Sequence, residues 1–155
     1  MAGAGDINGD GFDDVIVVAP RYGQPFNPPI QNKGSGEQGA VFVFLGSASG
    51  IVGRNPRDAH AMITPVSNGA PSQLRAFFGG SVDGAGDING DGYADIVIGA
   101  TGWNRNRPWP GVDTEDPPGE GAAFIYLGGP SGITGTNPTS AAAKIEGNQL
   151  DASMG

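Results

Sequence analysis

The segment Gly3-Ala-Gly-Asp-Ile-Asn-Gly-Asp-Gly-Phe-Asp-Asp-Val-Ile-Val-Val-Ala-Pro20 recurs 81 residues later, with 11 of 18 positions identical. The second copy is Gly84-Ala-Gly-Asp-Ile-Asn-Gly-Asp-Gly-Tyr-Ala-Asp-Ile-Val-Ile-Gly-Ala-Thr101. Residues 39–63 and 121–145 match at an offset of 82, with 14 of 25 positions identical. Self-similarity at a fixed period indicates a repeat architecture. The chain therefore divides into two copies of one unit, residues 1–76 and 77–155.

Composition and charge exclude several classes of protein. The chain has 29 glycines and 13 prolines. Without the repeat, so high a fraction would indicate a disordered chain. The net charge of −8 argues against a nucleic-acid partner, which would need clustered Lys and Arg. The absence of cysteine excludes disulfides and thiolate metal sites. No window approaches the ~20 apolar residues of a membrane-spanning helix, and the first residues lack the basic and apolar regions of a signal peptide.

Each unit contains short apolar runs that are rich in β-branched residues and bounded by Gly or Pro, as expected of buried strands. Four antiparallel strands in a unit of this length predict an all-β fold made of β-propeller blades. The predicted innermost strand is 78–83. The predicted second strands are 14–19 and 95–100, the third are 40–45 and 122–127, and the fourth are 60–64 and 142–146.

A loop rich in acidic residues precedes the strand at 14–19 and its counterpart at 95–100. Three carboxylates so close together repel one another unless a cation neutralises them. Hard oxygen ligands on a tight, glycine-turned loop suit Ca²⁺. The sequence thus predicts two structural Ca²⁺ ions per chain, with metal-free Asx-stabilised turns as the alternative. The predicted ligands are Asp6, Asn8, Asp10, Asp14 and the Phe12 backbone carbonyl, and then Asp87, Asn89, Asp91, Asp95 and the Tyr93 carbonyl.

The spacing of these ligands does not fit an EF-hand. An EF-hand requires a bidentate Glu at loop position 12 and a helix after it. Position 12 is Val17 in the first loop and Ile98 in the second, and both lie within predicted strands. A site that joins a loop to a strand is the remaining interpretation.

With these loops in place, the sequence resembles tandem FG-GAP repeats, the blades of the integrin α-subunit β-propeller and its bacterial relatives. The D-x-[DN]-x-D-G-x-x-D pattern is present at 6–14 and 87–95, and Phe78-Gly79 supplies the Phe-Gly element. Val18-Ala-Pro20 and Gly99-Ala-Thr101 are imperfect copies of the Gly-Ala-Pro element. The resemblance implies a Ca²⁺-stabilised, usually seven-bladed propeller that serves adhesion or ligand binding outside the cell.

Two blades cannot close a ring, because propellers have ~4–8 blades. The first unit lacks most of its innermost strand, and residues 149–155 resemble the start of another. We therefore expect this strand to be split across the two termini. Chains would then assemble head to tail, giving six blades as a homotrimer or eight as a homotetramer. The alternative is that the chain is one piece of a longer propeller.

The loop at 101–120 is a candidate surface for a protein or glycan ligand, because it combines aromatic and basic residues that are typical of binding hot spots. Packing of these side chains onto the blade is the alternative. A carbohydrate-binding, lectin-like propeller and an accessory piece of a secreted enzyme are further hypotheses. No pair of groups suited to acid–base catalysis lies outside the acidic loops, so we expect no enzyme. The candidate ligand-binding residues are Trp103, Arg105, Arg107 and Trp109.

Overall fold

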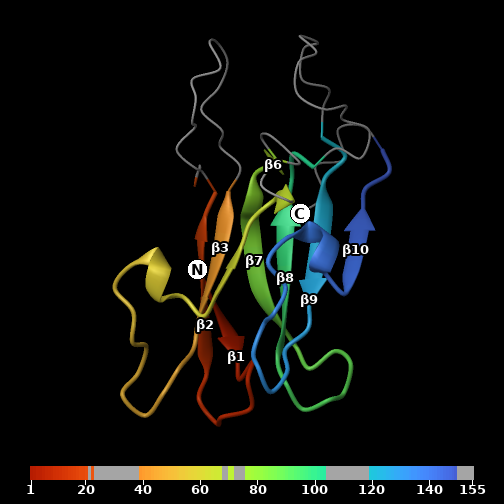
Figure 1. Ribbon diagram of the computed structural model, residues 1–155. Helices are drawn as coiled ribbons and strands as arrows, with labels where there is room; N and C mark the ends of the chain where they lie inside the picture. Colours follow the sequence, from red (N-terminus) through yellow and green to blue (C-terminus); the bar gives the residue numbers. More distant parts are fainter. Residues whose placement is uncertain (21, 23–38, 68–69, 72–75, 104–118, 150–155) are drawn as a thin grey trace.

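A computed structural model of the chain describes residues 1–20, 22, 39–67, 70–71, 76–103 and 119–149 (Figure 1). These residues form two four-stranded antiparallel sheets. In each sheet the strands follow one another in chain order, so that every strand pairs with its neighbours in the sequence. This arrangement confirms the predicted all-β fold and is consistent with two propeller blades.

The first sheet, called blade 1, contains β1 (Ala2–Gly5), β2 (Asp14–Ala19), β3 (Ala40–Phe44) and β4 (Ala61–Ile63). The β-branched residues of β2 pair along their whole length with β3, from Val15 opposite Phe44 to Ala19 opposite Ala40. The innermost strand β1 is short, and a bulge interrupts its pairing with β2 between Gly3 and Gly5.

The second sheet, called blade 2, contains β7 (Phe78–Gly86), β8 (Asp95–Ala100), β9 (Ala122–Tyr126) and β10 (Ala143–Glu146). The strand β7 is three residues longer than the predicted 78–83, because its glycines continue to pair with β8 past a second bulge. Residues 149–155, expected to share the innermost strand of blade 1, lie mostly outside the described residues.

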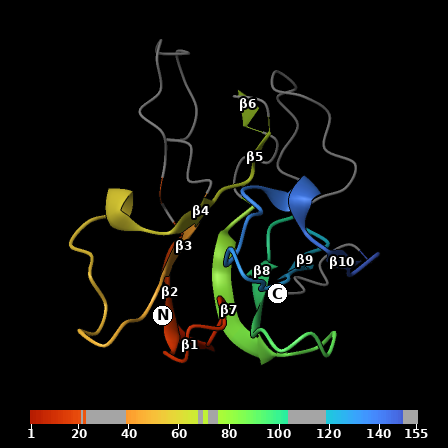
Figure 2. The same ribbon diagram turned by 60° about the horizontal axis from the view of Figure 1, so that its bottom comes forward.

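In the segment of chain that links β4 to β7, β5 (Val66–Ser67) and β6 (Ala70–Pro71) form a small hairpin, which the sequence did not predict. The view from below shows β1 and β7 beside each other, with the two sheets extending outward from them (Figure 2). The strands β1 and β7 are thus the innermost of their blades, and β4 and β10 are the outermost.

The core lies between the two sheets. Phe124 of β9 is buried in this core, with its ring centroid 5.6 Å from that of Phe78 and 4.8 Å from that of Trp103. Each fully buried aliphatic or aromatic side chain contributes roughly 1.5–3 kcal/mol to folding. The other buried members include Ile16, Val41, Val43 and Ile63 from blade 1, and Ile96, Ile98, Ala100 and Tyr126 from blade 2.

Each blade carries one 3₁₀ turn before its outermost strand, η1 (Pro56–Asp58) and η2 (Pro138–Ser140). At η1, the Asn55 side chain accepts a hydrogen bond from the Arg57 amide (2.9 Å) and donates one to the Asp58 carboxylate (2.9 Å). At η2, the Asn137 side chain accepts the equivalent hydrogen bond from the Thr139 amide (2.9 Å). Proline in the first turn has a preset φ and no amide hydrogen that would need a partner.

Replacing Asn55 with alanine is expected to lower the free energy of unfolding by about 1 kcal/mol, the usual cost of losing a capping side chain. Urea denaturation measures this change. Arg57→Ala is the control, because it keeps the backbone amide that Asn55 caps. An equal loss in both variants would contradict a capping role for Asn55.

No helix in the described part of the chain is long and apolar enough to cross a membrane.

Candidate functional site

The loop between β1 and β2 wraps around the carboxylate of Asp6. One oxygen accepts hydrogen bonds from the amides of Gly9 (2.7 Å) and Asp10 (3.0 Å), and the other from Gly11 (2.8 Å). Gly9 and Gly11 have φ values of +74° and +88°, which side chains with a Cβ rarely adopt. The two glycines therefore let consecutive amides point toward one carboxylate.

The loop between β7 and β8 repeats this geometry. The Asp87 carboxylate accepts from Gly90 (2.7 Å), Asp91 (3.0 Å) and Gly92 (2.8 Å). These hydrogen bonds, the one from Gly92 above all, stabilise the charged form and lower the pKa of Asp87 below its usual value. The two acidic loops therefore share one conformation, as the sequence repeat predicts.

The last acidic residue of each loop is fully buried at the start of a strand. Asp14 accepts hydrogen bonds from the amides of Ile7 (2.8 Å) and Gly46 (2.7 Å). Asp95 accepts the equivalent bonds from Ile88 (2.9 Å) and Gly128 (2.9 Å). Each buried carboxylate thus joins its own loop to the turn that follows the third strand of the same blade.

Gly46 and Gly128 are part of the site, although neither is among the predicted ligands. A Cβ on Gly46 would collide with the backbone carbonyl of Asp13, and one on Gly128 would collide with that of Ala94. Only glycine therefore lets these turns approach closely enough to donate to the buried carboxylates. Their equivalent places in the two units, at an offset of 82, are the signal that could have identified them.

The exposed acidic residues complete each loop. The Asp10 carboxylate accepts from the Asn8 side chain (2.9 Å) and from the Phe12 amide (3.0 Å), and Asp91 accepts the same bonds from Asn89 and Tyr93. Within the described residues, the carbonyl oxygens of Phe12 and Tyr93 accept no hydrogen bond. No described group therefore competes with another ligand for these two oxygens.

The charges in the first loop act on one another. Burial raises the pKa of Asp14, the bonds from Gly46 and Ile7 lower it, and the negative charges of Asp10 and Asp6 raise it further. In the described part of the chain, no lysine or arginine forms an ion pair with either loop. The acidic side chains are therefore close enough to repel one another, and no described lysine or arginine balances their charge.

The donor set fits a hard cation, although the described side chains do not gather three acidic groups around one point. The carboxylates instead turn toward the amides of their own loop. A carboxylate has about four lone-pair sites, so an oxygen that accepts one amide can still bind a metal. The predicted ligands of each candidate site therefore lie on one short loop and at the start of the strand that follows it.

A comparison with protein families finds FG-GAP repeats at residues 2–44 and 78–126, which together make up more than half of the chain. The chain belongs to the FG-GAP repeat family. Each FG-GAP match begins at the first residue of the innermost strand, includes one acidic loop and ends at the last residue of the third strand. The family is therefore matched over the part of each blade that builds the candidate site.

Curated relatives of these FG-GAP repeats are integrin α chains. The chain is 38% identical to mouse integrin alpha-IIb over 105 residues and 39% identical to mouse integrin alpha-2 over 102 residues. It is 32% identical to integrin alpha-PS2 of Drosophila melanogaster over 128 residues. These matches include 68%, 66% and 82% of this chain but only 7–8% of each relative. The likeness therefore concerns one small part of each integrin chain.

Of the candidate ligand-binding residues, Trp103 is described, whereas Arg105, Arg107 and Trp109 lie outside the described residues. The Trp103 side chain is only 9% exposed, packs edge-on against Phe124 and donates to the Glu146 carboxylate (3.1 Å). Lys144 lies over its ring at 5.7 Å. Trp103 therefore packs in the FG-GAP core, in agreement with the packing alternative, and has little surface left for a ligand.

Proposed function

We propose that this chain is a calcium-binding, non-enzymatic propeller module that works in adhesion or as a scaffold outside the cell. The observation that carries the proposal is the pair of acidic loops, which repeat the same hydrogen bonds at equivalent positions of two FG-GAP units. The adhesion role and the extracellular setting rest on the similarity to integrin α chains.

Calcium suits these loops because it prefers six to eight oxygen ligands in flexible geometry. In the first loop, Asp6, Asn8, Asp10, Asp14 and the Phe12 carbonyl would hold the ion, and the corresponding five residues would do so in the second. When bound, the ion would balance the carboxylate charges that raise the pKa of Asp14. Its role is structural, because it would join the loop to the buried start of the second strand.

Calorimetric titration is expected to find two Ca²⁺ ions per chain, and chelation is expected to lower the melting temperature. Asp91→Ala should reduce the stoichiometry to one, because Asp91 belongs to a single loop and is exposed. Asp13→Ala is the matched control: it removes an exposed carboxylate beside the first loop that has no acidic counterpart in the second. Absence of binding heat in the unmodified chain would refute the calcium assignment.

The alternative of a lectin-like propeller has less support, because Trp103 is buried rather than exposed. An enzymatic role also lacks support. The single histidine of the sequence, His60, is exposed, and its ring lies against Gly132 of blade 2. His60 therefore has no acidic or nucleophilic partner among the described residues.

A further inference from the structure

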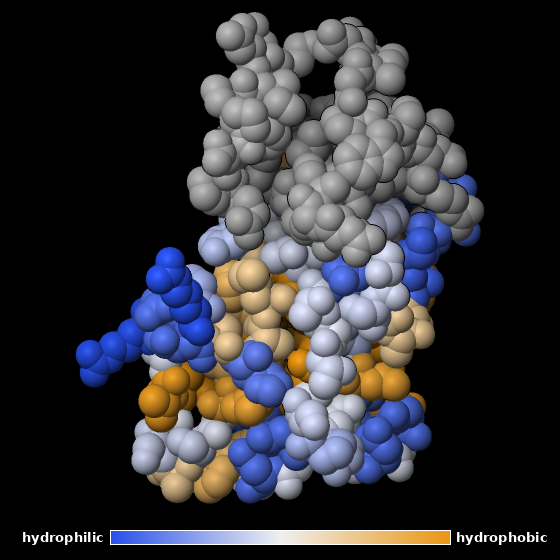
Figure 3. Space-filling view, in the orientation of Figure 1, coloured by the Kyte–Doolittle hydropathy of each residue, from blue (hydrophilic) through white to orange (hydrophobic). Residues whose placement is uncertain are grey.

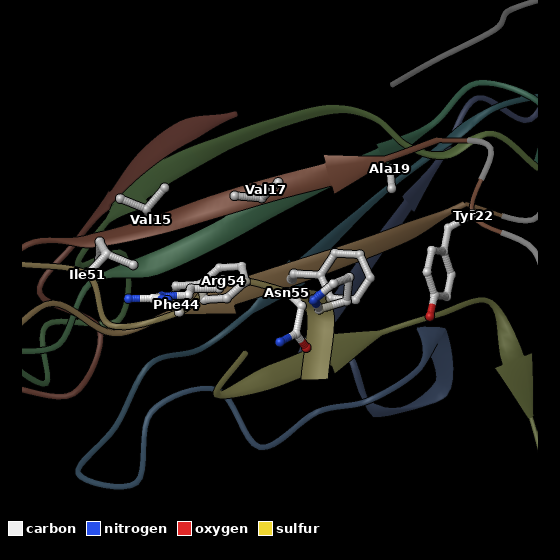
Figure 4. A pocket seen from close by; sticks show the side chains of 11 residues that line it. Val15, Val17, Ala19, Tyr22, Phe44, Ile51, Arg54 and Asn55 are labelled. Atoms are coloured by element: carbon white, nitrogen blue, oxygen red, sulfur yellow. The ribbon is translucent and has the colours of Figure 1, made fainter. Parts of the chain in front are cut away.

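One face of blade 1 is an apolar groove of about 370 Å³ on the side away from blade 2. Val15, Val17 and Ala19 of β2 point into it together with Phe44 and Tyr22, and Ile51 and Arg54 lie at its edge (Figure 4). The space-filling view shows hydrophobic atoms at the surface of blade 1, next to a hydrophilic projection (Figure 3). Exposed apolar surface of this kind, rimmed by polar residues, marks interaction sites.

The repeat indicates what kind of surface would fit this groove. The groove residues of β2 and β3, together with Tyr22 and Ile51, each have a counterpart in blade 2, 81 or 82 residues later, that is buried in the core shared with blade 1. Ile51 is 41% exposed, for example, whereas its counterpart Ile133 is 2% exposed. The other pairs are Val15 and Ile96, Val17 and Ile98, Ala19 and Ala100, Tyr22 and Trp103, Phe42 and Phe124, and Phe44 and Tyr126.

The far face of blade 2 shows the opposite asymmetry. Ile63 of β4 is completely buried beside blade 2, whereas its counterpart Ile145 in β10 is 51% exposed. Val97, Ala123 and Ile125 are half-buried, although their counterparts Ile16, Val41 and Val43 are fully buried. Blade 2 therefore exposes the surface that is equivalent to the one by which blade 1 packs against blade 2.

The acidic loops differ in the same way. The carbonyl oxygens of Asp6 and Ile7 accept hydrogen bonds from the blade 2 amides of Ala94 (2.9 Å) and Gly129 (3.0 Å). In the second loop, Ile88 is 52% exposed, whereas Ile7 in the first is completely buried. The residues equivalent to Ala94 and Gly129 are Asp13 and Ser47 of blade 1. A blade 1 packed beyond blade 2 would bring these two amides to the carbonyls of Asp87 and Ile88.

We infer that the groove of blade 1 docks the far face of blade 2 from a second copy of this chain. Both halves of the contact are present on one chain, and the contact within the chain provides its geometry. The interface is heterologous, so repeated docking closes a ring when the rotation fits. Three or four copies would supply six or eight blades, within the ~4–8 of known propellers. This inference deepens the proposed propeller role by naming its partner.

Light scattering coupled to gel filtration tests the inference with the unmodified chain at micromolar concentrations, with and without calcium. The expected mass is that of three or four chains. Ile145→Glu and Ile51→Glu each place a charge on one half of the interface, and both positions are exposed enough to leave the fold intact. Each variant alone should elute as a single chain, whereas Val52→Glu, an exposed apolar position outside both faces, should keep the assembly.

Mixing the two variants gives the sharper result. Ile145→Glu retains an intact groove and Ile51→Glu retains an intact far face, so the mixture should form a complex of two chains and stop there. A groove that docks another groove would instead let Ile145→Glu assemble alone, which would overturn the inference. A single-chain mass for the unmodified protein would also overturn it, even if calorimetry finds two Ca²⁺ ions. An assembly that binds no calcium would instead refute the calcium assignment alone.

Discussion

Replacing Asp14 with alanine is expected to lower the free energy of unfolding by about 3 kcal/mol, even in the presence of a chelator. The buried carboxylate accepts from the amides of Ile7 and Gly46, and both would lose their partner. Each buried donor left unsatisfied costs roughly 1–3 kcal/mol. The loss should persist without calcium, because these two hydrogen bonds do not depend on the metal.

Denaturation in EDTA separates the contribution of these two hydrogen bonds from that of bound calcium. Asp13→Ala removes the neighbouring carboxylate, which is exposed, and should change stability by no more than ~0.5 kcal/mol. If Asp14→Ala were harmful only when calcium is present, the carboxylate would act mainly as a metal ligand. The structural role that its two amide partners indicate would then be wrong.

Replacing Gly39 with alanine is expected to lower the free energy of unfolding by at least ~3 kcal/mol. Gly39 lies at the entry to β3 with a φ of +82°, where a Cβ costs roughly 1–2 kcal/mol. The new Cβ would also collide with the carbonyl oxygen of Phe78 and lie 3.1 Å from its amide nitrogen. Both atoms belong to the backbone of β7, so relief requires the two blades to move apart.

Gly50→Ala isolates the conformational part of this cost. Gly50 has a nearly equal φ of +79°, but a Cβ there would meet no atom within 4 Å. Urea denaturation of both variants should therefore show a clearly larger loss for Gly39→Ala. Equal losses would mean that the close approach of Gly39 to β7 contributes nothing to the packing of the blades.

Much of the fold can be predicted from the sequence, because the repeat doubles each signal. The β-branched run Asp14–Ala19 and its copy Asp95–Ala100 are strands with the predicted bounds. The extension of β7 to Gly86 was missed because glycine has no strand preference of its own. The capped turns were also missed, although the Asn-Pro pair at 55–56 recurs at 137–138.

The chemistry of the acidic loops was only partly predictable. The spacing of Asp6, Asn8 and Asp10 identified an oxygen-rich loop, since those residues lie close together in the chain. The bond from Gly46 to Asp14 joins residues 32 positions apart, and no local pattern reveals it. Trp103 was similarly ambiguous, because an aromatic residue beside arginines is found both at binding surfaces and in packed cores.

The clearest division between sequence and tertiary structure lies in the two acidic loops themselves. The segments 3–11 and 84–92 are identical, and their loops make the same hydrogen bonds, since short-range contacts depend only on local residues. Ile7 is nevertheless buried and Ile88 exposed. Burial depends on whether another blade covers the loop, and only the packing of blade against blade decides that. The sequence by itself determined the repeat, the strands and the conformation of the loops. The tertiary structure decided which of the two identical loop segments is covered by another blade and which remains exposed.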